Sequence, residues 1–429
     1  MASIYTTLMN SPAVDEFIVR DRTTTCSRRL LQPTQESTFS ESSQTEALIY
    51  SDTRLGRGQS LVDLSRGDAL DSQLRVGIQQ ARQSLGPNWR LQPPAAPARV
   101  LGSDDAILRD SDEIADEVFG TLQSHKPSSV ELLQAAVTIT RETSRVQISN
   151  GFDNQKLSAQ LDVEIHLLAK GGRPIRFQSS SRSLDIHWAA VLERESKRST
   201  AMATAISPDP GECDLVLLGD CYVPSNRHDF GIWTALCNQS SAELARTGLA
   251  RHQVGQSLRT EEFVGEELTL ASDGTLDFGL RTAPFGDFGQ PVRRFPIVTK
   301  MRASGQAMDY RDAAIAGGIA NGGVRNLVIA SGSKSEEELL SPTQRPMLVV
   351  HRIHEIHANT RGPISIQIAT GEWRERDKSG TVHRTPIRSC VISGNIYSWL
   401  QNAFYSTESS NYHWYVGPKA IRFNNLRVQ

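Results

Sequence analysis

Apolar residues at helical spacing predict three helices in the first half of the chain. The clearest stripe consists of Leu70, Leu74, Ile78, Ala81 and Leu85. Gly86-Pro87 ends this helix, because proline lacks the backbone donor that a helix needs. A second helix is expected over residues 111–123, where acidic residues in the first turn suit the helix dipole. A third covers residues 186–206, and the Pro-Asp-Pro-Gly run at 208–211 breaks it.

Alternating apolar and polar positions predict strands around these helices. Residues 17–19 and 47–50 are short apolar runs near the N-terminus. Between residues 137 and 177 the alternation is interrupted at Asn150-Gly151 and again at Gly171-Gly172. Asn-Gly between alternating runs predicts a hairpin with a type I′ turn, in which both central residues have positive φ.

The second half is predicted to consist mainly of strands. The strand-like segments are residues 215–218, 268–270, 275–276, 326–329, 347–357, 364–368 and 387–393. Two short helices are expected, one after the capping-box pair Ser335 and Glu338 and one over residues 396–404. The chain therefore predicts an α+β protein, with a mixed α/β domain over 1–207 and a β-rich, largely antiparallel domain over 208–429.

Charge and composition narrow the classes of function. The 429 residues include 46 Lys and Arg against 48 Asp and Glu, a net charge of −2, which argues against a nucleic-acid partner. Five scattered cysteines without a C-x-x-C pair indicate neither a disulfide framework nor a zinc ribbon. No apolar run reaches the length of a membrane span, and residues 1–17 lack a secretory signal pattern. We therefore expect a cytoplasmic protein without a membrane partner.

Three histidines and a glutamate within one short stretch are the most conspicuous candidate site. His351, His354, Glu355 and His357 could in principle hold a metal ion. Their β-branched neighbours predict a strand, which places His351, Glu355 and His357 on one face and His354 on the other. Six strand residues span roughly 20 Å, too far for one zinc ion with ligands at about 2 Å. We therefore interpret His351, His354 and the nearby Arg361 as candidate contacts to a substrate or a partner.

Two other motifs admit a catalytic or binding interpretation but fit structural roles better. Cys213, Cys221 and Cys237 lie near His228-Asp229 in the sequence, which admits a Cys/His nucleophile. Cys213, however, precedes a buried-type strand and Cys237 lies on a predicted helix, where thiols are commonly buried. Gly317-Gly318 and Gly322-Gly323 lack the spacing of a dinucleotide-binding loop, and a strand follows them where that loop needs a helix. We expect turns and close packing there.

The order of several short motifs resembles the TldD/PmbA family along nearly the whole chain. Residues 146–151 are similar to its strand followed by an Asn-Gly turn, and residues 326–329 to its Asn-Leu block after a glycine-rich stretch. Leu-Val-Val at 348–350, followed by Thr-Arg-Gly at 360–362, resembles a family strand pair. The terminal match runs from Pro386 through the Ile-Ser-Gly-Asn-Ile block to Asn402.

The resemblance implies two kinds of subunit, distinguished by zinc ligands. The TldD kind carries His-Glu-x-x-x-His on a helix and a later cysteine, so that two histidines bind zinc and the glutamate activates water. Here the residue five after His354 is Asn359, and the residue five after His228 is Trp233. Val416 precedes Gly417 where the family often has Cys-Gly. The chain is therefore similar to the TldE/PmbA kind, which accompanies a zinc-bearing partner.

This resemblance implies a metal-free, non-catalytic subunit of a heteromeric zinc metallopeptidase. Zinc is expected in a TldD-like partner, and the substrate class is peptides or peptide-like natural-product precursors. One alternative is an independent metal-dependent hydrolase that uses His351, Glu355 and His357, with His413 or Asp229 supplied by the fold. Another is a non-enzymatic binding or scaffold protein.

Overall fold

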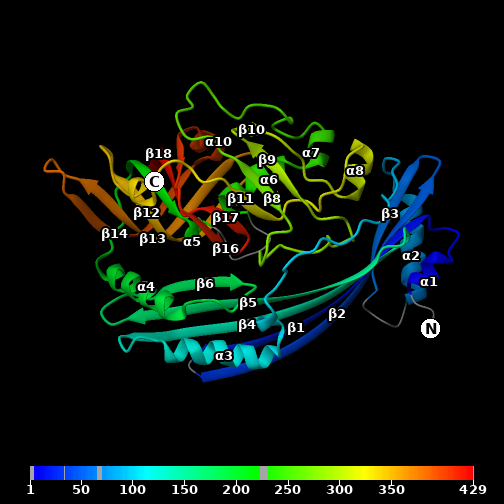
Figure 1. Cartoon of the computed structure of the whole chain (residues 1–429), viewed down its shortest axis with the longest axis horizontal. Helices are drawn as coiled ribbons and strands as arrows, with labels where there is room; N and C mark the ends of the chain where they lie inside the picture. The colour runs from blue at the N-terminus through cyan, green and yellow to red at the C-terminus, as the bar shows by residue number, and fades with distance from the viewer. Residues whose placement is uncertain (1–3, 33, 65–69, 223–229, 429) are drawn as a thin grey trace.

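The computed structural model of the chain describes residues 4–32, 34–64, 70–222 and 230–428. Figure 1 shows a long sheet that runs along one side of the molecule, with two further sheets and several short helices stacked on the other. Each sheet has six strands, and antiparallel pairs predominate. The α+β class predicted from the sequence is confirmed. In the described part of the chain, no helix is both long and apolar enough to cross a bilayer.

The first sheet has the strand order β3-β2-β1-β4-β5-β6 and is antiparallel throughout. Its strands are β1 (Glu16–Gln32), β2 (Thr34–Thr53), β3 (Gly56–Asp63), β4 (Val130–Ile148), β5 (Asp153–Ala169) and β6 (Ile175–Ser181). Its helices are α1 (Ile4–Met9), α2 (Leu70–Gln83), η2 (Asp105–Leu108), α3 (Ser111–Ser124), α4 (Trp188–Ala201) and η3 (Met202–Thr204). The three predicted helices therefore form close to their expected bounds, because each buries its apolar stripe against this sheet.

The first two strands extend far beyond the apolar runs that predicted them. β1 has 17 residues and β2 has 20, and the two pair without a break from Glu16–Tyr50 to Gln32–Thr34. Residues 34–43 of β2 are exposed and almost entirely polar. Pairing with the neighbouring strand, not burial, keeps this segment extended, and for this reason hydrophobic patterning does not reveal it.

The hairpin between β4 and β5 forms where the sequence predicts it, but its turn is of another kind. Gly151 has a φ of 96°, whereas Asn150 is not in the positive-φ region. A type I′ turn needs positive φ at both central residues. Instead, the Asn150 side-chain oxygen accepts a hydrogen bond from Phe152 N at 3.1 Å and closes a longer loop over 149–152. The type I′ prediction is therefore wrong.

Two sheets packed face to face form the second half. One has the order β14-β13-β12-β7-β18-β15 and the other β10-β9-β8-β11-β17-β16. The strands are β7 (Gly211–Leu218), β8 (Leu270–Asp273), β9 (Arg294–Thr299), β10 (Arg302–Ala303), β11 (Asn326–Ile329), β12 (Met347–Ala358), β13 (Pro363–Arg376), β14 (Val382–Asn395), β15 (Ala403–Tyr405), β16 (Ser409–Tyr412), β17 (Tyr415–Pro418) and β18 (Ala420–Val428). Both sheets contribute to one core, which includes Leu215 and Val350 from the first and Leu270 and Leu327 from the second.

Short helices lie in the connections between these strands. They are α5 (Gly219–Tyr222), η4 (Gly231–Trp233), α6 (Thr234–Gln239), α7 (Ala242–Arg246), α8 (Tyr310–Ala316), α9 (Glu336–Leu339), α10 (Ile396–Trp399) and η5 (Leu400–Asn402). The predicted capping box is present at α9, where the Ser335 hydroxyl accepts from Glu338 N at 3.1 Å. Gly317 caps α8 in the left-handed conformation, and Gly322 and Gly323 also have positive φ. These glycines are turns, as predicted.

Residues 275–276 do not form the strand that the sequence predicts. β8 pairs with β9 instead, and residues 274–293 leave the sheet without regular structure. Phe285, in this excursion, packs with Ile18 and Ile148 of the first sheet and with Phe152 in the connection between β4 and β5. The aromatic side chains therefore hold the excursion against the N-terminal sheet, and a β-hairpin would withdraw them from that contact.

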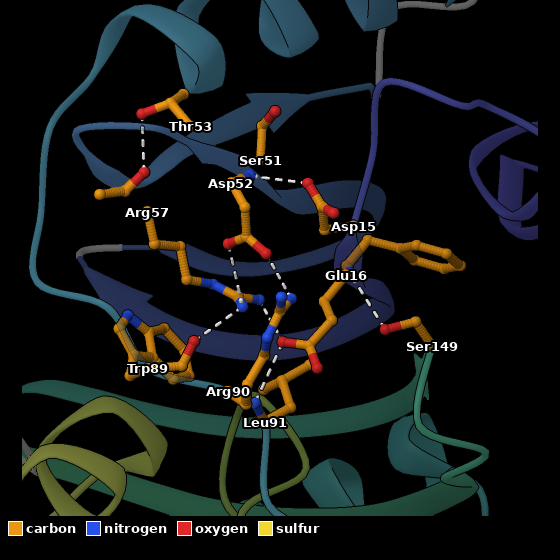
Figure 2. A network of polar contacts seen from close by, with 12 residues as sticks. Asp15, Glu16, Ser51, Asp52, Thr53, Arg57, Trp89, Arg90, Leu91 and Ser149 are labelled. Atoms are coloured by element: carbon orange, nitrogen blue, oxygen red, sulfur yellow. Dashed lines mark hydrogen bonds and ion pairs between the residues drawn. The ribbon is translucent and has the colours of Figure 1, made fainter.

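A buried arginine organises the start of the first sheet (Figure 2). Arg57 forms ion pairs with Glu16 and Asp52, and it donates to the Trp89 carbonyl at 2.8 Å. Its guanidinium lies over the Tyr50 ring at 4.7 Å and the Trp89 ring at 4.8 Å. Only 1% of its side chain is exposed. Arg57 therefore fixes the extended connector after α2 to the first two strands.

We predict that Arg57→Met lowers the free energy of unfolding by about 3 kcal/mol, because it leaves the Glu16 carboxylate partly buried without its cation. Urea denaturation followed by circular dichroism measures this change. Arg54→Met, at an exposed position three residues earlier, is the matched control and should shift the midpoint little. Equal shifts in both variants would contradict a structural role for the Arg57 network.

Candidate functional site

The histidine-rich segment lies on the strand β12, as predicted, but the strand is irregular. Its pairing with β13 shifts register between Val350 and Arg352 and again between Ile353 and Glu355. These bulges interrupt the strict alternation of faces expected for His351 and His354. The structure brings Glu355 and His357 together, with His357 Nε2 at 3.0 Å from Glu355 Oε2. Both side chains are more than half exposed, so this pair is a surface contact.

The polar residue of this segment with a clear role is Arg352, which sequence reasoning missed. It donates to the Glu195 carboxylate of α4 at 2.7 Å and lies over the Phe177 ring of β6 at 5.1 Å. The Glu195 side chain is completely buried and also accepts from Arg194 at 2.9 Å and Arg198 at 2.8 Å. Arg352 therefore joins the second half of the chain to the helix that covers the first sheet.

Arg361 lies at the turn between β12 and β13, and its side chain is exposed. The turn itself is held in place: Arg251 donates to the Arg361 carbonyl at 2.8 Å, and Gln239 donates to the Thr360 carbonyl at 2.9 Å. An exposed guanidinium on a fixed turn is well placed to contact another molecule. His354, on the same hairpin, is exposed as well.

The other residues considered from the sequence do not assemble a reactive centre. Burial raises the pKa of the Cys213 thiol to about 12 and that of Cys390 to about 11, and it raises the pKa of Cys237 further. These thiols stay protonated near neutral pH and are poor nucleophiles. His413 Nδ1 donates to the Ser180 carbonyl at 2.7 Å, at the junction with the first sheet. Asp229 lies outside the described residues.

In the described ranges, the side chains that could bind zinc do not lie together. No three side chains of the types His, Cys, Asp and Glu lie close enough there to share a metal. The one His-Glu dipeptide, His354-Glu355, is on the strand β12 and not on a helix, and the residue five positions after His354 is Asn359 where the motif has its second histidine. The residues described here therefore do not fit the zinc site that the TldD kind of subunit carries.

We predict that Arg352→Met lowers the free energy of unfolding by about 2 kcal/mol, because the buried Glu195 carboxylate loses one charged hydrogen bond. The measurement is urea denaturation followed by circular dichroism. Arg384→Met on β14, in the same sheet, is the control, since that side chain is 61% exposed. If Arg352→Met were as mild as the control, Arg352 would not be a junction residue.

Comparison with known proteins supports the family suggested by the motifs. Residues 234–429 match the family model of the PmbA/TldA metallopeptidase C-terminal domain. Among curated proteins, none shows a significant match to the chain.

Solved structures share the fold over almost the entire length. TldE from Thermococcus kodakarensis superposes with a TM-score of 0.75 at 17% identity, covering 97% of each chain. A candidate modulator of DNA gyrase from Bacteroides thetaiotaomicron gives 0.74 at 14% identity, with 100% of each chain covered. Another, from Thermotoga maritima, gives 0.75 at 14% identity over 96% of each chain. Residues 234–429 therefore match the PmbA/TldA C-terminal domain, and the whole chain shares the fold of these structures.

Proposed function

We propose that this protein is a TldE-like subunit, without a metal of its own, of a heteromeric zinc metallopeptidase. Two observations together support the proposal. The chain shares the fold of TldE over almost its whole length, and its histidines and cysteines do not form a zinc site in the described ranges. The catalytic zinc would then belong to a TldD-like partner. The substrates would be peptides or peptide-like natural-product precursors.

The contribution of this chain would be to bind the partner and help present the substrate. His351, His354 and Arg361 are the candidate contact residues, on β12 and the turn that follows it. The turn is anchored through its carbonyls by Gln239 and Arg251, so the exposed Arg361 side chain projects from a fixed backbone, which lowers the entropy cost of binding.

Co-expression with a TldD-like protein from the same genome tests the pairing. We expect the two chains to co-elute in size exclusion and peptidase activity to require both. Activity should be lost when the His-Glu-x-x-x-His motif of the partner is altered. A chain that elutes alone beside every TldD-like candidate would contradict the proposal.

Metal analysis separates this function from an independent metal-dependent hydrolase. We expect the purified chain, dialysed against zinc and then against buffer, to retain far less than one zinc per chain. The double variant His351→Ala/His357→Ala should leave the zinc content of the purified chain unchanged, because in this proposal neither imidazole binds a metal. Stoichiometric zinc that this double variant abolishes would favour the hydrolase.

The contact residues are tested by affinity. His354→Gln/Arg361→Gln should weaken association with the partner about tenfold, as expected for the loss of a charged contact. Lys378→Gln is the control, because Lys378 is exposed in the turn at the other end of β13. Surface plasmon resonance gives the dissociation constants, and an unchanged value in the double variant would remove these residues from the interface.

A further inference from the structure

A cavity of about 420 Å³ lies at the junction between the first sheet and the sandwich. Strands β4 and β5 form one wall, and the excursion 274–293 with residues 322–325 forms the other. Its volume is within the range of cavities that bind small molecules. Neither the histidine-rich segment nor the turn at Arg361 lines it, so it is a separate place in the molecule.

Positive charge predominates in this junction cavity. Among the described residues that line it, five are cationic and two, Glu142 and Asp287, are carboxylates. Two of the cations have other contacts: Arg182 donates to backbone carbonyls of the excursion, and Arg281 lies over the rings of Phe230 and Trp414. The remaining three, Arg22, Lys156 and Arg325, face the cavity with the two carboxylates among them.

The two carboxylates do not pair with all the hydrogen-bond donors of these three cations. Lys156 is paired with Asp287 at 3.1 Å. Arg22 Nε is 3.7 Å from Glu142, beyond hydrogen-bond distance, and this buried nitrogen has no hydrogen-bond partner. Arg325 Nε donates to the Gly322 carbonyl at 3.1 Å, but no described carboxylate lies within 4.0 Å of its guanidinium. Donors of two guanidinium groups are therefore available to a ligand.

The cations in the cavity are partly buried and repel one another. Burial lowers the pKa of Arg325, and burial together with the charge of Arg325 lowers the pKa of Lys156. Burial alone would raise the pKa of Asp287, but the charges of Lys156 and Arg325 outweigh it and lower that pKa to about 2, so this carboxylate is ionised at neutral pH. A bound anion would reduce the mutual repulsion of the cations.

The mixture of charges restricts the kind of anion. Guanidinium groups bind carboxylates in a planar, bidentate geometry. Glu142 and Asp287 would repel a polyanion, whereas both could accept hydrogen bonds from an ammonium group. Leu157, Phe288 and Val324 add apolar surface to the walls. A molecule with a carboxylate at one end, an ammonium group at the other and a short apolar body complements this arrangement.

We propose that the junction cavity binds a short zwitterionic peptide, with its C-terminal carboxylate on Arg325 and Arg22 and its ammonium group near Asp287 and Glu142. The cavity lies entirely within this chain. Binding therefore does not depend on the pairing with a TldD-like partner, and the purified chain alone is the sample for the test.

Isothermal titration calorimetry with trialanine is the experiment. We expect trialanine to bind, and its C-terminal amide to bind at least about tenfold more weakly, because a charged hydrogen-bonded contact is lost. N-acetyl-trialanine, which lacks the ammonium group, should also bind more weakly. Absence of trialanine binding, or equal affinity for the amide, would overturn the proposal. Tighter binding of inorganic phosphate than of trialanine would overturn the assignment of a carboxylate ligand.

Variants locate the binding. Arg325→Gln should weaken trialanine binding about tenfold, and Arg22→Gln provides a second variant in case the first disturbs folding. Arg293→Gln, an exposed position near the cavity that does not line it, removes the same charge and should keep the affinity of the parent. Circular dichroism checks that each variant is folded. Unchanged affinity in folded Arg325→Gln and Arg22→Gln proteins would place trialanine elsewhere and refute the proposed site.

Discussion

The junction between the first sheet and the sandwich depends on the buried guanidinium of Arg182. It follows β6 directly and donates to the carbonyls of Gly102 at 2.8 Å, Thr282 at 2.9 Å and Leu280 at 2.7 Å. These carbonyls belong to segments without regular structure, whose backbone groups no strand or helix pairs. One side chain thus satisfies acceptors that would be costly to bury alone, and it fixes the excursion that forms a wall of the junction cavity.

The junction is reinforced at other points by polar contacts of long side chains. Arg352 reaches Glu195 of α4, His413 reaches the Ser180 carbonyl, and Lys156 reaches Asp287. Each contact joins the sandwich to the first sheet or its covering helix. Because ionised groups are costly to bury, their pairing favours one relative position of the two halves over others. The cavity between the halves follows from that position.

Most helices and strands were predictable, because the residue patterns that favour them lie within short stretches of the sequence. The apolar stripe of α2, the capping box at Ser335 and the apolar run of β7 each identify an element from its own residues. The polar part of β2 was not predictable, because its extended form comes from pairing with β1. Residues 275–276 were misjudged for a similar reason: a β-branched threonine and a leucine favour a strand locally, but aromatic contacts of the following segment hold the chain in another position.

The sequence by itself determined that the histidine and glutamate spacing of a zinc peptidase is missing, because spacing is a property of the chain alone. It also predicted a strand for the histidine-rich segment. Only the tertiary structure decided which charged groups of that segment have partners, and it alone brought Arg22, Lys156 and Arg325 to one cavity. More than a hundred residues separate each of these side chains from the next along the chain. Their proximity therefore depends on how the whole chain folds, which local residue patterns do not show.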